Sequence, residues 1–469
     1  MAPYPRDGGG TLVLSVTVDA QPVPGSPWPM AGRDARHTGR QVFAPLFGLN
    51  PGSIYWIFDT GQPTRRLQAS VAIGPEGRIF FGSDMSGSGK LFAVDVLNGQ
   101  PSLAWAYYRD APNGPVLQDI FSKPALGLYV GSGQEDGEPA GGGDSPVPVY
   151  AVYFGCDDGR LRCLSRTGQL LWRSRYVGDI EDGPVIASNG RVYVCGTLED
   201  GRGYLYAFSP VNSGLEVEPI WSYQVGGNAR GAPAVWEADG YAYVIALSVN
   251  GQLSKVRDDG AWGTAVWTRS LLGPYFSYPV IGDDGTIYCA TFWLCCSDNW
   301  IYAVRMDNGE LKWEALPNRR ISVATKTNVV PPVTGAFGPV KNACIGPGGD
   351  VYLGTQVVHL GPFQGEHHLL RITDLGTTGI ATVAHVANPS YRVDPVPMTA
   401  TKSPTGTTYL VFAPESGLLY VSDPSGQSVY YPFPTMTARL DNPGIVMDHS
   451  GIIYVGANNG KLYAVVGPH

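Results

Sequence analysis

The sequence predicts an all-β fold, an eight-bladed β-propeller of four-stranded antiparallel blades. The first observation is a hairpin pattern that recurs eight times, in which an apolar–Tyr–apolar–Gly strand is followed by a turn and an apolar–Tyr–Ala–Val strand. The last copy, at 453–456 and 462–465, is the clearest. The second observation is the composition, because 62 Gly, 39 Pro and 26 Tyr are typical of turn-rich antiparallel sheet. A unit of this size, repeated this often, favours a radial array of blades.

The spacing of the repeats matches the size of a propeller blade. The interval from Gly155 to Gly196 is close to the roughly 40–50 residues of a four-stranded blade. The interval from Gly82 to Gly155 is longer. The longer intervals contain irregular segments, and we predict exposed insertions at about 131–148 and about 317–339.

Each repeat accounts for four strands. A short inner strand comes first, as at 183–186, and the recurring hairpin supplies the second and third. A turn such as Asn308-Gly309 then leads to a fourth strand, since Asn and Gly permit the positive φ that tight reversals need. The fourth strand ends in a tryptophan in five repeats, at Trp105, Trp172, Trp221, Trp267 and Trp313.

The last repeat stops after its third strand, at Val466. A strand without a blade of its own lies near the other end of the chain, at about 53–59. We predict that this strand completes the last blade as its outer strand and closes the ring. The pairing would also cover an edge that could otherwise pair with another molecule.

Residues 1–27 are predicted to form an N-terminal arm, and residues 28–469 a single propeller domain. The arm contains one alternating apolar and polar stretch at 11–19, which indicates a strand, and Pro22 and Pro24 separate it from the propeller. The preferred interpretation is an extra strand on the flank of the propeller. The alternative is an arm that adds a strand to the sheet of a partner protein.

The charge and the cysteines bear on partners and compartment. The net charge is −8 and the Lys and Arg residues are not clustered, so nucleic acid is not expected as a partner. The chain contains no run of 18 apolar residues, so no membrane span is predicted. Seven cysteines, an odd number, do not form a disulfide framework, which favours a reducing compartment. The protein is expected in the cytoplasm if Met1 is the native start, and exported or periplasmic if a signal peptide was removed.

Two patterns carry a family resemblance. Ala303, Gly309 and Trp313 follow an order that resembles the tryptophan-docking repeat of the quinoprotein (PQQ-like) β-propellers. The segments 28–30 (Trp-Pro-Met) and 37–39 (His-Thr-Gly) resemble the stretch that opens many PQQ-like repeat proteins. That family includes dehydrogenases as well as non-catalytic scaffolds such as the outer-membrane assembly propeller lipoprotein. The resemblance therefore implies a fold more strongly than an activity.

The resemblance also implies a structural role for the recurring tryptophans, which in the family pack between neighbouring blades. In this chain we expect that docking role for Trp56, Trp105, Trp172, Trp221, Trp267 and Trp313.

A cofactor, if the resemblance extended to one, would lie on the propeller axis. Family dehydrogenases bind PQQ there with a calcium ion, an Asp base, a stacking Trp and, in some members, adjacent cysteines. Cys295 and Cys296 are adjacent here, but the repeat pattern places them in a hairpin on the outer half of their blade. The chain has neither a calcium loop of alternating Asp and Asn ligands nor a c-type haem motif. No cofactor is therefore expected, and PQQ with calcium is the less favoured alternative.

One histidine cluster is a weak candidate for a metal site. Its members are His359, Glu366, His367 and His368. Imidazoles must converge on one point to bind a metal, and His359 could face His367 or His368 across a hairpin. Neighbouring residues on a strand point to opposite faces, so only one of that pair can take part. A solvated hairpin tip is the preferred interpretation, and His37 is expected to be a packing or capping residue.

The starts of the inner strands offer a candidate binding site, because they would surround one mouth of the central channel. The side chains there carry both charges and tyrosine, which suits a polar ligand or a peptide. The preferred interpretation, however, is a set of solvated side chains without a ligand. The candidates are Lys123, Glu181, Asp182, Arg230, Tyr278, Lys341, Asp394 and Asp441.

The sequence contains no complete catalytic constellation. We therefore expect a non-catalytic propeller that acts as a protein-binding scaffold or structural module in a larger assembly. The partner is expected to be another protein, bound through the strand at 11–19 or the loop at 131–148. The alternatives are an enzyme, either a quinoprotein dehydrogenase or a polysaccharide lyase, and a carbohydrate-binding propeller.

Overall fold

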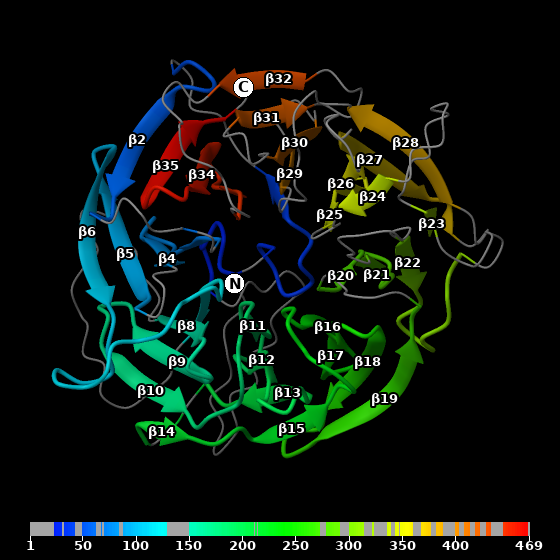
Figure 1. Cartoon of the computed structure of the whole chain (residues 1–469), viewed down its shortest axis with the longest axis horizontal. Coiled ribbons are helices and arrows are strands. Elements are labelled where there is room, and N and C mark those ends of the chain that lie inside the picture. The colour runs from blue at the N-terminus through cyan, green and yellow to red at the C-terminus, as the bar shows by residue number, and fades with distance from the viewer. Residues whose placement is uncertain are drawn as a thin grey trace, which may run out of the picture.

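The chain folds into β-sheets that stand side by side around a central axis (Figure 1). The computed structural model describes 35 strands in eight sheets, and no α-helix occurs among the described residues. The described residues are 23–30, 32–42, 49–61, 67, 70–83, 88–128, 150–210, 212, 214–272, 278–290, 300–313, 321–322, 335–338, 343–346, 348–359, 367–376, 381–387, 399–402, 408–412, 418–422, 428–432 and 444–467.

Each sheet begins with a short inner strand near the axis and ends at the rim. Sheet 1 consists of β3 (Ala72–Ile73), β4 (Ile79–Ser83), β5 (Lys90–Leu97) and β6 (Gln100–Tyr107). Sheet 2 consists of β7 (Ala125–Leu128), β8 (Tyr150–Cys156), β9 (Arg160–Ser165), β10 (Leu170–Ser174) and β14 (Glu216–Val217). Sheet 3 consists of β11 (Val185–Ile186), β12 (Val192–Thr197), β13 (Gly203–Phe208) and β15 (Trp221–Gln224). Sheet 4 consists of β16 (Ala234–Ala238), β17 (Tyr241–Leu247), β18 (Gln252–Asp258) and β19 (Gly263–Ser270).

The second half of the ring follows the same plan with additions. Sheet 5 consists of β20 (Val280–Ile281), β21 (Ile287–Ala290), β22 (Trp300–Val304) and β23 (Ile321–Ser322). Sheet 6 consists of β24 (Gly335–Gly338), β25 (Ala343–Ile345), β26 (Val351–His359), β27 (His367–Asp374) and β28 (Ala381–Ala387). Sheet 7 consists of β1 (Arg40–Val42), β29 (Thr399–Lys402), β30 (Thr408–Phe412), β31 (Leu418–Ser422) and β32 (Ser428–Pro432). Sheet 8 consists of β33 (Val446–Met447), β34 (Ile452–Gly456), β35 (Lys461–Val466) and β2 (Ile54–Asp59).

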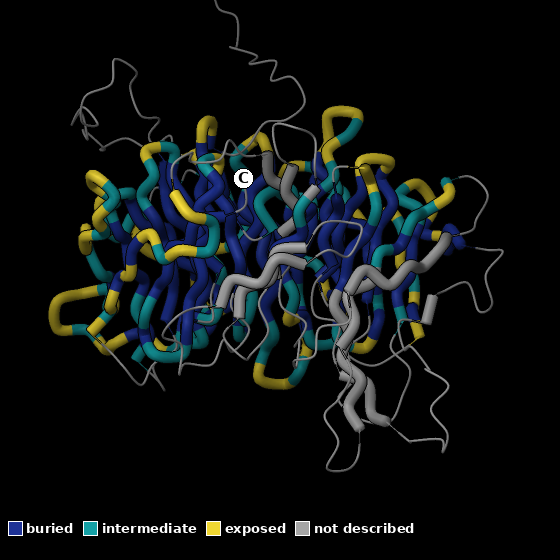
Figure 2. The backbone as a smooth tube through the Cα atoms, turned by 90° about the horizontal axis from the view of Figure 1, so that it is seen from above, coloured by how far each residue is buried: buried dark blue, intermediate teal, exposed yellow. Residues whose placement is uncertain are grey.

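Neighbouring strands pair antiparallel, which confirms the prediction of an all-β fold built from antiparallel sheets. Two added strands pair in parallel instead: β1 beside β29 and β14 beside β10. Seen edge-on, the described strands are mostly buried and the turns at the two faces are exposed (Figure 2).

The outer strand of sheet 8 comes from the other end of the chain. In the register of β2 and β35, Ile54 lies opposite Val465 and Asp59 lies opposite Lys461. The Lys461 Nζ atom lies 3.1 Å from a carboxylate oxygen of Asp59, so an ion pair accompanies the backbone pairing. This is the pairing expected from the strand at 53–59.

Parts of sheets 5 and 6 differ from the sequence-based expectation. Two short strands, β23 and β24, lie within 317–339, which was expected to be an irregular insertion. Trp313 does not end the fourth strand of sheet 5, because it precedes β23 and follows a bridge between Val304 and Leu311. Its indole is fully buried and packs beside the Tyr288 ring, with 6.1 Å between the ring centroids. Burial of this large ring fixes its place in the interior and leaves the edge of the sheet to β23.

The hydrophobic core lies between neighbouring sheets. Phe80 of sheet 1 and Phe154 of sheet 2 belong to one buried cluster, and Phe58 of sheet 8 belongs to another with Phe81 of sheet 1. Both faces of each inner hairpin are therefore covered, which explains why strands such as β8 are buried along their whole length. The ring is stabilised by apolar surface that each sheet removes from water against the next.

Tryptophans of outer strands lie against turn glycines of the following sheet. The Trp105 indole N–H donates to the Arg166 carbonyl over 2.9 Å, and its ring covers Gly168 in the turn between β9 and β10. The Trp267 indole N–H donates to the Met306 carbonyl over 3.0 Å, and its ring covers Gly309. Glycine is needed at both positions, because φ is positive and a Cβ atom would come within 2.8 Å of the indole.

The neighbouring strand in the same sheet explains how the ring of each docked tryptophan fits. Trp105 lies opposite Ala93 in the register of β5 and β6, and Trp56 lies opposite Ala464 in the register of β2 and β35. Both pairings contain a register irregularity next to the tryptophan. A small residue and a local bulge leave room for the indole to turn toward the neighbouring sheet.

Polar contacts join neighbouring sheets as well. The hydroxyl of Tyr193 in sheet 3 donates to Asp258 at the end of β18 over 2.6 Å, and the Trp221 indole donates to the same carboxylate over 3.0 Å. The hydroxyl of Tyr288 in sheet 5 donates to Asp374 at the end of β27 over 3.1 Å. The recurring tyrosine of the hairpin pattern therefore serves the contact between sheets rather than a ligand.

We predict that Gly309→Ala destabilises the protein more than Gly240→Ala. Both glycines have positive φ, at 73° and 78°, so alanine carries a backbone cost of about 1–2 kcal/mol at either site. No atom lies within 4 Å of a Cβ at Gly240, whereas a Cβ at Gly309 would press on the Trp267 ring and add about 1–3 kcal/mol. Chemical denaturation measures both losses. Equal losses would contradict a docking role for Trp267.

Candidate functional site

The described residues of 28–42, which are 28–30 and 32–42 and are here called the axial segment, run through the centre of the ring (Figure 1). Carbonyl groups of this segment accept hydrogen bonds from backbone N–H groups of inner strands in sheets 1, 2, 4, 5 and 6, in chain order. The pairs are Ile73 N–H with Trp28 at 2.8 Å, Leu126 with Pro29 at 2.7 Å, Val235 with Ala35 at 2.6 Å, Ile281 with Arg36 at 2.9 Å and Ile345 with Thr38 at 2.9 Å.

The end of the axial segment is β1, which pairs with the inner strand of sheet 7, with Arg40 opposite Ala400. Between the contacts to sheets 2 and 4, the fully buried Met30 side chain packs in a cluster with residues of sheets 2 to 4. The axial segment therefore contacts most of the sheets in turn. Backbone N–H groups at the inner edges, which need an acceptor when they are buried, find it in this segment.

A compact loop shapes the middle of the axial segment. The Gly39 N–H donates to the Gly32 carbonyl over 2.8 Å. One carboxylate oxygen of Asp34 accepts from the Arg36 N–H over 3.0 Å and from the Thr38 N–H over 3.1 Å. The other oxygen accepts from the Thr38 hydroxyl. The Asp34 side chain thus replaces backbone partners within the loop, as aspartates commonly do in turns.

The structure places five of the predicted channel-mouth residues around this segment. The Lys123 Nζ atom lies 3.1 Å from a carboxylate oxygen of Asp182, and both side chains are largely buried. The same Nζ atom lies 4.8 Å from the centre of the Tyr278 ring. Arg230 pairs with Glu181 over 3.1 Å, with exposed side-chain fractions of 51% and 33%. The other three candidates, Lys341, Asp394 and Asp441, lie outside the described residues.

His37 belongs to the same group, although the sequence indicated only packing or capping. Its ring meets the Tyr278 ring edge to face at 4.7 Å, and its Nδ1 atom lies 3.2 Å from the Pro279 carbonyl oxygen. Burial lowers the pKa of His37 to about 4, against the opposing charge of Asp182. The neutral imidazole therefore donates from Nδ1 to Pro279, which leaves Nε2 as an acceptor.

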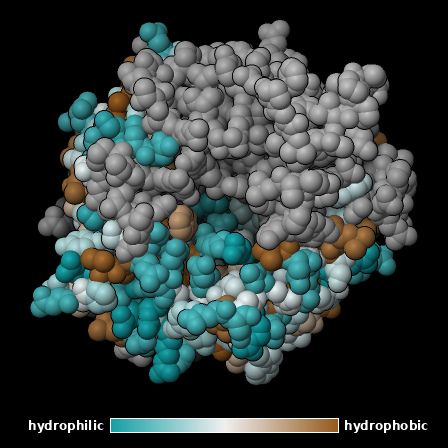
Figure 3. Space-filling view, in the orientation of Figure 1, coloured by the Kyte–Doolittle hydropathy of each residue, from teal (hydrophilic) through white to brown (hydrophobic). Residues whose placement is uncertain are grey.

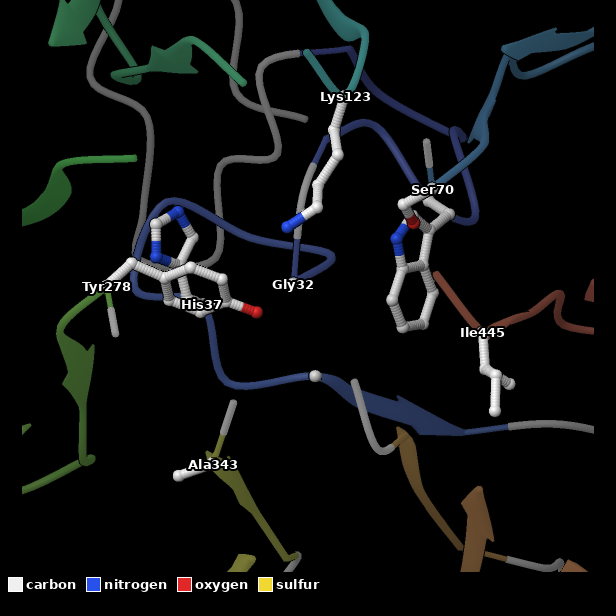
Figure 4. A pocket seen from close by; sticks show the side chains of 9 residues that line it. Gly32, His37, Ser70, Lys123, Tyr278, Ala343 and Ile445 are labelled. Carbon is white, nitrogen blue, oxygen red and sulfur yellow. The ribbon is translucent and has the colours of Figure 1, made fainter. Parts of the chain in front are cut away.

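These side chains border one small cavity (Figure 4). Its free volume is about 10 Å³, close to the minimum for one water molecule. Two buried nitrogens of residues that line it, Trp28 Nε1 and His37 Nε2, have no hydrogen-bond partner among the described residues. The lining residues are Trp28, Gly32, His37, Gly39, Ser70, Lys123, Tyr278, Ala343 and Ile445.

The face that surrounds the axis is polar. Figure 3 shows a hollow at the centre of this face, and the described residues beside it are mostly hydrophilic. Burial raises the pKa of the Glu181 carboxyl, while the charge of Arg230 opposes that shift. Burial also raises the pKa of Asp179, again against the charge of Arg230. Arg230 therefore interacts with two carboxyl groups, those of Glu181 and Asp179.

The described residues of the axis do not fit PQQ with calcium. The axial segment lies where the resemblance would put the cofactor, and the remaining cavity is far smaller than a tricyclic quinone. Among the described residues, no group of three or more His, Cys, Asp or Glu side chains is arranged to hold a metal ion. Cys295 and Cys296 lie outside the described residues. The expectation of no cofactor stays a prediction.

The histidine cluster lies at the ends of β26 and β27. The backbone register puts His367 opposite Gln356 and His368 opposite Thr355, while His359 lies opposite Gly335 of β24. Glu366 lies outside the described residues. The weak metal site at His359, Glu366, His367 and His368 therefore stays a prediction.

The described cysteines behave as small apolar residues. Five of them, Cys156, Cys163, Cys195, Cys289 and Cys344, are buried and free. Burial raises the pKa of each thiol, so the reactive thiolate is suppressed at neutral pH.

Comparisons with known proteins confirm the family resemblance. A family model described as outer membrane protein assembly factor BamB matches residues 157–334. The quinoprotein alcohol dehydrogenase PedH of Pseudomonas putida is 26% identical over 204 residues, which are 40% of this chain and 31% of that protein. The chain thus matches about a third of the length of that curated relative.

Solved structures with low sequence identity share the propeller fold. Quinohemoprotein alcohol dehydrogenase from Comamonas testosteroni has a TM-score of 0.60 at 15% identity, covering 96% of this chain and 82% of that one. BamB from Moraxella catarrhalis has a TM-score of 0.51 at 14% identity, covering 88% and 98%. Sqt1 from Saccharomyces cerevisiae has a TM-score of 0.56 at 9% identity, covering 88% and 98%. At these identities the likeness establishes the fold alone.

No helix in the described part of the chain is long and apolar enough to cross a membrane.

We predict that His37 makes the protein less stable as the pH falls from about 6.5 to about 4. The pKa of His37 is about 4 in the folded protein and has an ordinary value of 6.5 in an unfolded chain, so within this window the unfolded chain binds a proton that the folded protein excludes. The contribution is absent above this window, grows as the pH falls, and levels off below it at roughly 3 kcal/mol.

The matched control is His37→Asn. Asparagine tolerates the positive φ of 59° at this position and keeps a side-chain N–H for Pro279. Denaturation of both proteins at pH 7 and pH 4 measures the difference, since the other titrating groups are common to both. The expectation is wrong if the wild type loses no more stability than the variant over this range.

Proposed function

We propose that this protein is an eight-bladed β-propeller, closed by the pairing of β2 with β35, that acts as a non-catalytic scaffold for protein binding. The observation that carries the proposal is that the chain's own residues 28–42 fill the described part of the axis. The free volume beside them is about 10 Å³, so a substrate of ordinary size has no room there. While that segment stays in place, contacts with other molecules are left to the faces and the rim.

The channel mouth is the surface that best suits a partner. Lys123 and Asp182 are largely buried and hold neighbouring sheets together, whereas the Arg230 side chain is 51% exposed and that of Glu181 is 33% exposed. Exposed charges of both signs favour a partner with a complementary pattern and have more effect on specificity and association rate than on affinity. The segments 11–19 and 131–148, outside the described residues, remain predicted contacts with a protein partner.

A quinoprotein dehydrogenase is the second candidate. The similarity to quinoprotein alcohol dehydrogenase PedH over 204 residues favours it. The axial segment argues against it, because those residues occupy the place that the cofactor would need. A polysaccharide lyase and a carbohydrate-binding propeller have no comparable observation in their favour.

We predict that the purified protein does not retain PQQ. After incubation with PQQ and calcium followed by gel filtration, the protein peak is expected to lack quinone absorbance, since the described axis has no space for the ring system. A dye-linked assay with primary alcohols should give no turnover above the protein-free control. A stoichiometric chromophore with turnover would instead support the dehydrogenase.

We predict that reversing the charge of Arg230 weakens partner binding. The test compares wild type, Arg230→Glu and the double variant Glu181→Arg/Arg230→Glu, each recovered from the native source under mild cross-linking, with co-purifying chains quantified by mass spectrometry. Recovery of the specific partner is expected to fall about tenfold in both variants, which corresponds to about 1.4 kcal/mol. The double variant restores the ion pair but presents the opposite pattern to the partner.

The control is Arg202→Glu. Arg202 pairs with Asp200 over 2.6 Å in the turn between β12 and β13, and its side chain is 54% exposed, close to the 51% of Arg230. Exposed pairs of this kind contribute about 0–1 kcal/mol, so the fold should withstand all three changes. Unchanged recovery in the Arg230 variants would exclude the mouth as the binding surface.

A further inference from the structure

The geometry of the axis points to a binding site for a peptide. We propose that the channel accepts a polypeptide segment, that the chain fills it with its own axial segment, and that a matching segment of a partner protein can replace it. This inference rests on the proposed scaffold function and specifies the chemistry of the partner. It does not depend on the charged surface at Glu181 and Arg230.

Recognition in the channel is mostly through the backbone. Five inner-strand N–H groups, from Ile73 to Ile345, donate to carbonyl groups of the axial segment at 2.6–2.9 Å. Every residue of a partner peptide carries such a carbonyl group, so these bonds fix the path of the peptide backbone without requiring a particular sequence. This is the logic of strand addition, in which backbone bonds give affinity and side-chain pockets give specificity.

Two apolar anchors near the start of the segment provide the specificity. Trp28 is 2% exposed and belongs to the buried cluster of sheets 8 and 1. Met30 is 0% exposed and belongs to the cluster of sheets 2 to 4. Pro29 between them has no N–H group, and only its carbonyl is used, by the Leu126 N–H. A partner segment would therefore carry two large apolar residues separated by one position.

A basic residue completes the pattern. The guanidinium groups of Arg36 and Arg40 lie 3.0 and 2.8 Å from the Asp283 carboxylate. The Asp283 side chain is 54% exposed, so it can meet a positive group from either chain. The proposed partner is thus a peptide with an aromatic–x–apolar start followed by arginine.

The axial segment is held under conditions that favour its exchange. Among the described residues only four non-glycine residues have positive φ, and two of them, Arg33 at 72° and His37 at 59°, lie in this segment. Such backbone strain persists only where the surroundings impose it, and it is frequent at switch regions. The Trp28 Nε1 and His37 Nε2 atoms are also buried without a partner among the described residues, which costs free energy while the segment occupies the channel.

The experiment uses the full-length chain and a fluorescein-labelled synthetic peptide with the sequence of residues 26–42. Fluorescence polarisation measures its binding to wild type and to Trp28→Ala, in which the segment loses an anchor while the rest of the channel is unchanged. The Trp28→Ala chain is expected to bind the peptide at least about tenfold more tightly than wild type, because its own segment competes less well. A peptide with the same Trp28→Ala change is the matched control and should bind neither chain.

Hydrogen exchange gives the second readout. In the Trp28→Ala chain the amides of Leu126, Val235, Ile281 and Ile345 are expected to exchange faster than in wild type, and the peptide is expected to restore their protection. If these amides stay protected in the variant, the segment does not leave the channel and the proposal is wrong. If they lose protection and the peptide does not restore it, the channel is not a peptide site and the proposal is equally wrong.

Two further outcomes can be told apart. Should Trp28→Ala fail to fold, the variant Arg36→Ala/Arg40→Ala replaces it, since these side chains are partly exposed and outside the core. Loss of the native partner in Arg230→Glu together with no peptide binding would leave the scaffold function standing and refute only the channel site. Peptide binding without any native partner would support the channel site and refute the scaffold function.

Discussion

The inner edge of each sheet poses the constraint on which the rest of the structure depends. Inner strands such as β3 and β20 are only two residues long, and they turn backbone N–H groups toward the axis. A buried N–H without an acceptor costs about 1–3 kcal/mol, and the ring gathers these groups in one place. The carbonyl groups of the axial segment accept hydrogen bonds from the N–H groups of five inner strands and so meet this requirement. The propeller therefore has a central strand as well as a ring of sheets.

Most strands of the ring could be predicted from the sequence, because the residue patterns that indicate them are local and repeated. The pairing of β2 with β35 followed from one repeat that lacked a strand and one strand that lacked a repeat. Trp105 and Trp267 occupy the same position in their repeats. Each ring covers a glycine in a turn of the neighbouring sheet. Trp313 broke the pattern, since its buried ring lies ahead of the fourth strand rather than within it. Repetition predicts average geometry and fails where one copy departs from the others.

The centre of the molecule could not be predicted in the same way. The Trp-Pro-Met and His-Thr-Gly segments were visible, but nothing in the sequence repeats them, so periodicity could not place them in space. Lys123, Asp182 and Tyr278 were expected at the channel mouth from the starts of their strands. That the His37 ring would lie against Tyr278 depends on the path of a segment with positive φ at two non-glycine residues, which no propensity encodes. Sequence spacing predicted residues at the channel mouth but could not place the axial segment inside the channel.

The axial segment also explains how two proteins with the same fold can differ in activity. Similarity to a quinoprotein alcohol dehydrogenase covers only part of the chain, whereas the likeness of fold extends over 96% of it. What decides the chemistry of a ring of sheets is the occupant of its axis, because only there do many sheets present groups to one ligand. In this chain a peptide backbone takes that place and uses the inner N–H groups through its carbonyls. The inner N–H groups that would have to recognise a small molecule are thereby bonded to the backbone of the axial segment.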